Sequence, residues 1–327
     1  MDQSRGTHQK HFAQFGIPFT GDEDFDTKSA VVREMLVSAP SLGEVFTGAI
    51  VHDDLFDLTD SRGVPLQKVL EEQGVIVIGK KLGLNDITGL ATGLDELPGE
   101  LDKLVQLGVH MIKTRTTIKF GMPEFAEEAA RQMVRVHEAT AKNGDIAAIL
   151  EPEFLIKNEG NLQQNEQIMT DVLRRMIKGI DNSEFRNHPF FIKTSFPTPG
   201  TKSSESINPE ASAEAFERIC KNAGIPKELL IVFLSGGHSS ATSRSLLQTM
   251  AQVRVNAGSS FSRANLERPY QATFPREGVI DVPAGQRQLY AEGVKNQLAI
   301  EGLYYTGLED ATPEQILDEA NRMRNPQ

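Results

Sequence analysis

Short apolar runs alternate with helical stretches along most of the chain. Each run is rich in valine, isoleucine or other apolar residues and ends in a charged or glycine-bearing turn, after which apolar residues recur at helical spacing. Seven strand–helix units of this kind predict a mostly parallel sheet whose strands are buried on both faces. The runs cover residues 45–51, 74–79, 108–113, 145–150, 190–192, 229–234 and 253–257.

The ends of these runs indicate which parallel fold to expect. Charged residues gather at the carboxyl ends of the runs, where a (β/α)₈ barrel builds its active site. A doubly wound sheet also binds ligands there and is the alternative, but no G-x-G-x-x-G fingerprint follows an early run. We therefore predict that residues 1–327 form a single α/β domain, a (β/α)₈ TIM barrel with C-terminal helices over 284–300 and 312–323. Thr312 and Gln315 have the spacing of a capping box.

One lysine stands where a strand is expected to end. The run at 190–192 leads into Lys193, and the chain then turns through Pro197, Pro199 and Gly200. This pattern predicts a buried strand that carries an amine to its carboxyl end. A lysine whose pKa is lowered by its surroundings can attack a carbonyl and form a Schiff base. The alternative is a strand-end lysine that extends to solvent.

Two pairs of charged residues follow neighbouring runs. Lys113 and Arg115 are two positions apart, as are Glu151 and Glu153. Residues two apart on a strand share a face, so each pair can point at one ligand. A cation beside Lys193 would favour its neutral amine by like-charge repulsion, and paired carboxylates can divide the acid and base roles of Schiff-base chemistry. Ordinary surface charges and a solvated acidic loop are the alternatives.

Two loops rich in glycine and serine follow the last two runs. The first spans 234–240 and contains Gly236 and Gly237, and the second spans 259–263 and ends in Arg263. Glycines let backbone N–H groups approach an oxyanion, and barrels often hold phosphate at the loops after their last two strands. Plain turns are the alternative.

Composition limits the classes of protein and partner. The 327 residues carry a net charge of −11 and a pI near 5.2, which argues against a general nucleic-acid or anionic-membrane binder. The lone Cys220 excludes an intrachain disulfide and predicts a reducing, cytoplasmic setting. No apolar run approaches the ~18 residues of a membrane span. The seven histidines form no HExxH or Cys–His cluster, so no metal site is predicted.

Several motifs together resemble those of class I fructose-bisphosphate aldolases, the metal-independent Schiff-base type. The likeness covers nearly the whole chain and is nearest to bacterial members. Asp2-Gln3-Ser4-x-Gly6-Thr7-x-x-Lys10 is similar to D-[EQ]-S-x-G-S-x-x-K, residues 113–115 to K-x-R, 151–153 to the end of V-E-P-E, 193–200 to K-P-N-x-x-T-P-G, 233–237 to F-L-S-G-G and 260–264 to S-F-S-R-A.

The resemblance implies a lyase that cleaves fructose 1,6-bisphosphate reversibly to dihydroxyacetone phosphate and glyceraldehyde 3-phosphate, without metal or cofactor. Lys193 takes the place of the Schiff-base lysine and Lys113 that of the lysine beside it. Glu151 matches the acid–base carboxylate and Glu153 its supporting partner. Asp2 matches the aspartate that assists carbinolamine formation and carbon–carbon cleavage. The residues matched to the two phosphate ends are Ser235, Gly236, Ser262 and Arg263 for one, and Thr7, Lys80 and Arg115 for the other.

The chain also departs from the family pattern. Thr194 and Ser195 replace a Pro-Asn pair, and the K-V-D-K stretch falls on 77–80, where only Lys80 survives. Only Met1 precedes Asp2, so the first barrel strand is expected to be missing from this sequence. The alternatives that remain are a Schiff-base aldolase for another phosphorylated sugar or sulfosugar, and a non-catalytic barrel that serves as a binding protein. A homo-oligomer stays open, as does the physiological direction.

Overall fold

The computed structural model describes residues 5–325, and their contacts divide the chain into two compact units. Unit 1 comprises Met1–Lys80, Ser262–Ala299 and Leu303–Gln327, whereas unit 2 comprises Lys81–Phe261 and Ile300–Gly302. Unit 2 is formed almost entirely by one continuous stretch, and unit 1 combines the two ends of the chain.

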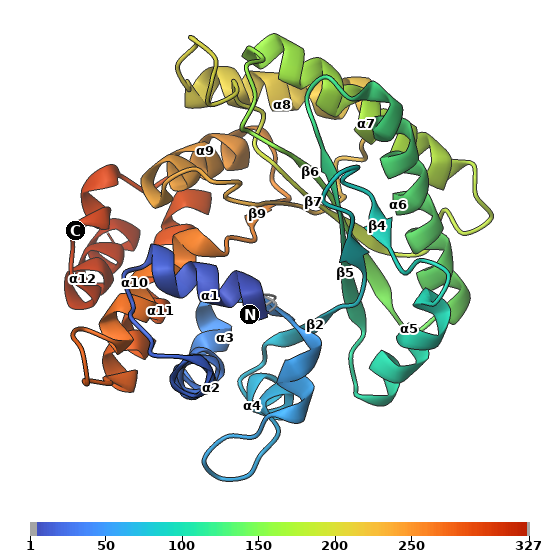
Figure 1. Ribbon diagram of the computed structural model, residues 1–327. Coiled ribbons are helices and arrows are strands. Elements are labelled where there is room, and N and C mark those ends of the chain that lie inside the picture. The colour runs from blue at the N-terminus through green and yellow to red at the C-terminus, as the bar shows by residue number, and fades with distance from the viewer. Residues whose placement is uncertain (1–4, 326–327) are drawn as a thin grey trace. The chain divides into compact units, whose positions relative to one another are not determined.

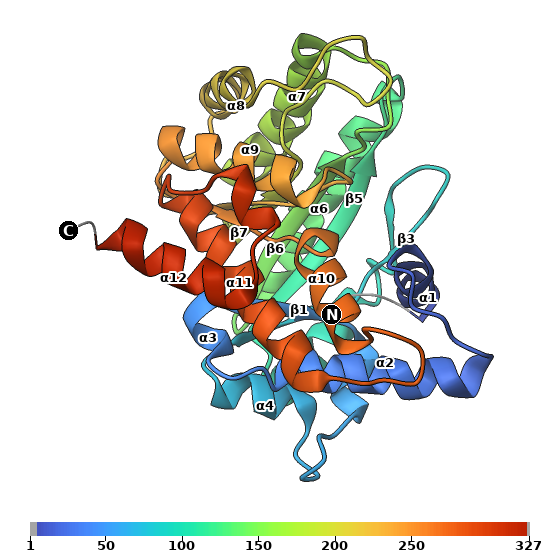
Figure 2. The same cartoon turned by 90° about the vertical axis from the view of Figure 1, so that its left-hand side faces the viewer.

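Unit 1 is mainly helical and contains a pair of parallel strands (Figures 1 and 2). Strands β1 (Gly48–Val51) and β2 (Ile76–Lys80) pair from Gly48 opposite Ile76 to Val51 opposite Gly79. The α-helices are α1 (Arg5–Gln14), α2 (Asp22–Val37), α3 (Leu42–Val45), α4 (Leu66–Glu72), α10 (Arg263–Thr273), α11 (Val282–Ile300) and α12 (Pro313–Arg324), and the 3₁₀-helices are η1 (Asp53–Asp57) and η2 (Thr306–Glu309).

An aromatic cluster holds three helices of unit 1 together. The ring of Phe12 on α1 meets Phe25 of α2 edge-on at 5.5 Å and Tyr270 of α10 at 5.8 Å. All three side chains are almost completely buried. Edge-to-face rings add about 0.5–1.5 kcal/mol per pair beyond their buried area, so this cluster is a main contact of α1.

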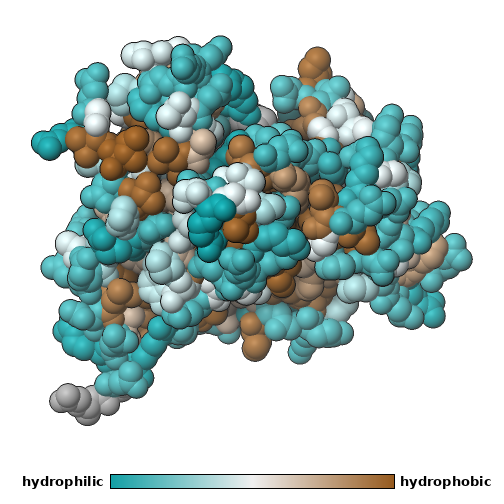
Figure 3. Space-filling view, turned by 90° about the horizontal axis from the view of Figure 1, so that it is seen from below, coloured by the Kyte–Doolittle hydropathy of each residue, from teal (hydrophilic) through white to brown (hydrophobic). Residues whose placement is uncertain are grey.

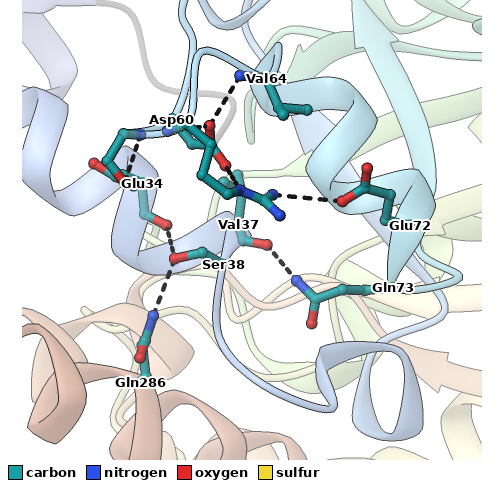
Figure 4. A network of polar contacts seen from close by, with 10 residues as sticks. Glu34, Val37, Ser38, Asp60, Val64, Glu72, Gln73 and Gln286 are labelled. Atoms are coloured by element: carbon teal, nitrogen blue, oxygen red, sulfur yellow. Dashed lines mark hydrogen bonds and ion pairs between the residues drawn. The ribbon is translucent and has the colours of Figure 1, made fainter.

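A polar network closes the carboxyl end of α2 (Figure 4). Gln73, just after α4, donates to the carbonyl of Val37 at 2.6 Å. The hydroxyl of Ser38 donates to the carbonyl of Glu34 at 2.6 Å and accepts from Gln286 of α11 at 3.0 Å. Carbonyls in the last turn of a helix lack the usual partner within the helix, and Gln73 supplies one to Val37, whereas the Glu34 carbonyl also accepts the backbone N–H of Ser38. Helices α2 and α4 are in contact.

Unit 2 is built on five parallel strands. They are β5 (Met111–Ile118), β6 (Ala147–Phe154), β7 (Phe190–Thr194), β8 (Ile231–Phe233) and β9 (Ala257–Ser259), paired in that order. The α-helices are α5 (Leu97–Gln106), α6 (Pro123–Asn143), α7 (Leu162–Asp181), α8 (Pro209–Ala223) and α9 (Ser240–Val253). A short antiparallel hairpin of β3 (Gly83–Leu84) and β4 (Ala91–Thr92) precedes them.

The helices of unit 2 cover the outer side of these strands (Figure 1). Helix α6 contacts β5 and β6, α7 contacts β6, α9 contacts β9, and consecutive helices from α5 to α9 touch one another. Their apolar stripes face inward: α6 buries Ala129, Met133 and Val136, and α8 buries Phe216 and Ile219. The apolar stripes seen in the sequence therefore belong to the core. Because β5 to β9 are parallel, their carboxyl ends lie at the same edge of the sheet.

Each of the seven predicted runs overlaps a strand, but several strands continue past the predicted end of their run, β5 and β6 furthest. Strand β5 continues five residues past its run and β6 continues four, so Arg115, Glu151 and Glu153 lie within strands rather than in the turns after them. These strands can continue because side chains alternate between the two faces of a strand. The charged residues occupy one face, while β-branched or other buried residues occupy the opposite face. The C-terminal helices are confirmed, and both halves of the predicted capping box at Thr312 are present.

The helices and the surface agree with the absence of a long apolar run in the sequence. Within the described part of the chain, no helix is long and apolar enough to cross a membrane. The face shown in Figure 3 is covered mainly by hydrophilic side chains, with hydrophobic ones in separate patches. That residues 1–327 form a single domain stays a prediction.

Candidate active site

Strands β5 and β6 align two rows of charge at their carboxyl ends. Their register places Arg115 opposite Glu151 and Thr117 opposite Glu153. Lys113, Arg115 and Thr117 share one face of β5, because side chains alternate along a strand. The pairs predicted from spacing are therefore brought together on one face of the sheet.

A buried cluster of two lysines and one glutamate forms where β5, β6 and β7 meet. Glu151 Oε2 lies 3.0 Å from the Nζ of Lys113, and Oε1 lies 3.4 Å from the Nζ of Lys193. The three side chains are only 5%, 2% and 7% exposed, respectively. Removing charged groups from water costs several kcal/mol each, and the carboxylate between the two amines offsets part of that cost for both. Lys193 does not extend to solvent, which rules out the alternative drawn from the sequence.

A second ion pair lies two residues further along the same strands. Arg115 Nε is 2.6 Å from Glu153 Oε2, and the arginine side chain is 40% exposed, compared with 15% for the glutamate. Burial raises the pKa of the Glu153 carboxyl, and the negative charge of Glu151 acts in the same direction, while Arg115 and Lys193 oppose them. Glu153 therefore retains a proton more readily than an ordinary glutamate. An ionised and a protonatable carboxyl on one strand can divide base and acid roles.

The loop from β8 to α9 turns through two consecutive glycines. Gly236 and Gly237 have φ values of 58° and 104°, which glycine adopts without strain. The backbone N–H of His238 donates to the Ser235 carbonyl at 2.9 Å. The side chain of Ser239 caps α9 by accepting from the Thr242 N–H at 3.1 Å. The loop thus lies at the positive end of a 14-residue helix, where a phosphate is favoured.

This loop is attached to the strand that carries the lysine. The Leu234 N–H donates to the Thr194 carbonyl at 2.9 Å, directly after Lys193. Further along the same loop, the Nε2 of His238 lies 3.4 Å from the hydroxyl of Thr198. Burial lowers the pKa of the His238 imidazole, so the neutral ring is favoured at this contact. His238 was noted in the sequence only as part of the Gly-Gly loop, and its link to Thr198 needs strand adjacency that spacing does not reveal.

The other predicted site residues belong to unit 1 or lie outside the described residues. Thr7 is on α1, Lys80 is the last residue of β2, Ser262 is the N-cap of α10 and Arg263 is its first residue. Asp2 lies outside the described residues. The cluster around Glu151 is therefore built from unit 2 alone. Among residues 5–325, no group of three or more His, Cys, Asp or Glu side chains is placed to hold a metal ion.

Two hydroxyl residues at the site were missed as contributors. Thr194 and Ser195 were noted in the sequence only because they differ from the family pattern. In the structure both are buried, and both bond to the backbone of β6 next to the glutamates. A signal was present, since two hydroxyl residues directly follow the lysine, but the strand that they contact could not be read from sequence.

Two known proteins match this chain over most of its length. The chain is 27% identical over 262 residues to the probable fructose-bisphosphate aldolase class 1 of Xylella fastidiosa (strain Temecula1), a match that covers 77% of each chain. It is 28% identical over 314 residues to the chloroplastic fructose-bisphosphate aldolase 2 of Arabidopsis thaliana, which covers 93% of this chain and 77% of that protein.

A solved structure extends the match to the fold. A fructose-bisphosphate aldolase from Plasmodium falciparum superposes with a TM-score of 0.82, covering 94% of this chain and 90% of that one, at 21% sequence identity. This confirms the predicted barrel class, of which the described residues supply seven parallel strands. The family model for glycolytic class-I fructose-bisphosphate aldolases matches residues 1–322. The chain therefore belongs to the class-I fructose-bisphosphate aldolase family.

Proposed function

We propose that the protein cleaves fructose 1,6-bisphosphate reversibly to dihydroxyacetone phosphate and glyceraldehyde 3-phosphate through a Schiff base on Lys193. The observation that carries this proposal is the buried amine of Lys193, 3.4 Å from a carboxylate that also faces Lys113. Family membership supports the reaction, and the geometry supports these residues as its centre.

The first half of the reaction joins the amine to the ketone. The Nζ of Lys193 attacks the C2 carbonyl, and the carbinolamine that forms must lose its hydroxyl as water, which requires an acid. Glu151 lies within reach of the amine and is the proposed acid and base. Glu153, with its raised pKa, is the proposed proton reserve beside it. Lys113 holds Glu151 in place by its 3.0 Å contact.

The second half breaks the C3–C4 bond. Its electron pair moves into the protonated imine and forms an enamine, while the C4 hydroxyl loses a proton and becomes the aldehyde of the first product. We propose that Asp2 assists this step, as the resemblance implies. The enamine then takes a proton at C3, and the water released earlier is balanced by the water that hydrolyses the imine. The iminium accepts the electrons that a metal ion would otherwise stabilise, so we propose that neither metal nor cofactor is needed.

Phosphate binding would hold the ketone beside the amine. One phosphate is proposed to bind Ser235 and Gly236 together with Ser262 and Arg263, and Thr7, Lys80 and Arg115 are proposed for the other end of the substrate. A ketone held in this way reacts as if the attack were intramolecular, with effective molarities of about 10⁵ M or more in well-oriented systems. A glycolytic role in the cytoplasm belongs to the same proposal.

Trapping the imine tests the proposal directly. Borohydride added with dihydroxyacetone phosphate should convert the imine to a stable amine, which mass spectrometry locates on Lys193. The Lys193→Met variant should give no adduct and lose roughly a thousandfold or more of the cleavage rate. Lys227→Met, which removes an exposed lysine, is the matched control and should behave as wild type. A folded wild-type sample that forms no adduct at residue 193 would sink the proposal.

A related sugar phosphate remains the second candidate substrate. Arg115, assigned by resemblance to the far end of the substrate, is engaged with Glu153 at 2.6 Å. An arginine already paired in this way could contribute less to a second phosphate. Comparing kcat/KM for fructose 1,6-bisphosphate and fructose 1-phosphate decides between them, since a preference for the monophosphate would favour the second candidate.

A further inference from the structure

The backbone pairing between β6 and β7 stops one residue short of the reacting groups. The register pairs run from Ala148 opposite Phe190 to Leu150 opposite Ile192. Glu151 and Lys193 are the next residues on each strand. On its other side, β7 stays paired with β8 as far as Thr194 opposite Phe233. The amine of Lys193 and the carboxylate of Glu151 therefore lie where the backbone pairing of β6 with β7 ends.

Proline at position 152 accounts for the interruption. The side-chain hydroxyl of Thr194 donates to the Pro152 carbonyl, so Pro152 presents its backbone polar groups toward β7. A residue in a strand points its N–H and C=O to the same neighbour, and proline has no N–H to give. The hydrogen bond that a backbone N–H at position 152 would donate to β7 is therefore missing, and it would have held the Glu151–Pro152–Glu153 segment against that strand.

Two side-chain hydroxyls occupy the place of the ladder. Thr194 Oγ1 donates to the Pro152 carbonyl at 2.9 Å. Ser195 Oγ accepts from the Phe154 N–H at 2.9 Å and donates to the Phe154 carbonyl at 2.9 Å. Thr194 and Ser195 are 0% and 1% exposed, so water does not compete for these bonds. Both backbone groups of Phe154 depend on one hydroxyl.

We infer that Thr194 and Ser195 are positioning residues, whose hydroxyls hold the end of β6 so that Glu151 and Glu153 keep their place beside Lys193. The two anchored backbone positions, 152 and 154, flank Glu153, and Glu151 directly precedes the first of them. The inference rests on the proposed function, because it assigns a role within that site. A displacement of about 1 Å at a reacting centre can cost about a hundredfold in rate, so the hydroxyls need not touch substrate to matter.

Isosteric removal of each hydroxyl tests the inference. Thr194→Val and Ser195→Ala should each lower kcat and the rate of borohydride trapping about tenfold or more. KM for the bisphosphate should change less than about threefold, because the Ser235–Gly236 loop does not depend on these hydroxyls. Thr194→Ser and Ser195→Thr keep a hydroxyl and should retain most of the rate.

A matched control lies on the neighbouring strand. Thr116 stands opposite Pro152 in the β5–β6 register and is fully buried, and its hydroxyl has no hydrogen-bond partner among the described residues. Thr116→Val makes the same chemical change next to the same proline, yet removes no bond. It should leave kcat and KM as in wild type.

Amide exchange supplies a readout that does not need turnover. The Phe154 amide should exchange slowly in the wild-type chain and much faster in Ser195→Ala. Fast exchange in the wild type would overturn the inference even if a variant failed to fold. Variants whose kcat stays within about twofold of wild type would also overturn it. So would a loss of kcat that is accompanied by an equal rise in KM and that the Thr116→Val control shows as well. A wild-type chain that forms no adduct would overturn the proposed function and with it the positioning role, whereas an adduct that forms equally fast in all variants would overturn the positioning role alone.

Discussion

At the scale of single residues, the site depends on one carboxylate that serves two amines. Glu151 contacts both Lys113 and Lys193 while exposing almost none of its surface. Removing one member of a buried ion pair is strongly destabilising, because the charge that remains loses its partner in a site that excludes water. The Glu151 carboxylate therefore contributes both to the stability of the folded chain and to its proposed chemistry.

Glu151→Gln should expose that link. The amide keeps the shape but removes the negative charge that lies 3.0 Å from the amine of Lys113 and 3.4 Å from that of Lys193. We expect a loss of roughly 3–5 kcal/mol in unfolding free energy, measured by denaturant titration, together with loss of the trapped adduct. Glu214→Gln breaks an exposed ion pair with Arg218 and should change stability by less than about 0.5 kcal/mol. Equal stability for wild type and Glu151→Gln would show that the cluster is not held by charge.

At the scale of elements, the sequence predicted the strands that carry the charges but not what holds them in register. Short apolar runs that end in charged or glycine-bearing turns located β5, β6 and β7. The roles of Thr194 and Ser195 could not be predicted, since a hydroxyl bonded to a neighbouring strand looks like any loop residue until the strands are paired. The β3–β4 hairpin was missed because two residues per strand give no measurable period.

Helix α1 offers a second case in which a side chain positions an element. His8 on α1 has Nδ1 2.9 Å from the Ser29 hydroxyl on α2 and Nε2 3.2 Å from the Tyr270 hydroxyl on α10. Burial, with the charge of Arg33 as a further cause, lowers the pKa of His8 to about 3. The neutral imidazole therefore links three helices, and α1 carries the predicted site residue Thr7.

This link should make the fold sensitive to acid. The unfolded chain binds a proton on His8 near the ordinary pKa of 6.5, whereas the folded chain does so only near 3. Between these values the unfolded state holds more protons, so the unfolding free energy falls as the pH is lowered from about 6.5. His8→Phe cannot titrate, so its slope against pH should be shallower than that of wild type, by up to about 1.4 kcal/mol per pH unit. Parallel slopes for the two proteins in denaturant titrations from pH 7 to pH 4 would contradict this account.

At the scale of the whole molecule, the division into two units is what sequence patterns predicted least. The strand and helix units were found in order, but unit 1 combines residues from both ends of the chain, and no periodicity reports which distant segments meet. The fold class was nevertheless predictable, because seven repeated units and the position of their charges leave few parallel arrangements. The candidate site was predictable to the same extent: the residues that bear charge were named, and those that act through the backbone were not.

The net charge of −11 is also a property of the whole chain, and it gives a prediction of its own. A chain with this excess repels itself in the compact state, and salt screens that repulsion, since the Debye length falls from about 30 Å at 0.01 M to about 8 Å at 0.15 M. Tm at pH 7 should therefore rise with added sodium chloride over this range. At pH 5.2, near the pI, the net charge vanishes and the same salt should change Tm little. A fall in Tm at pH 7 would mean that attraction within surface ion pairs, such as Arg175 with Asp171, outweighs the repulsion of the excess charge, because salt weakens those pairs.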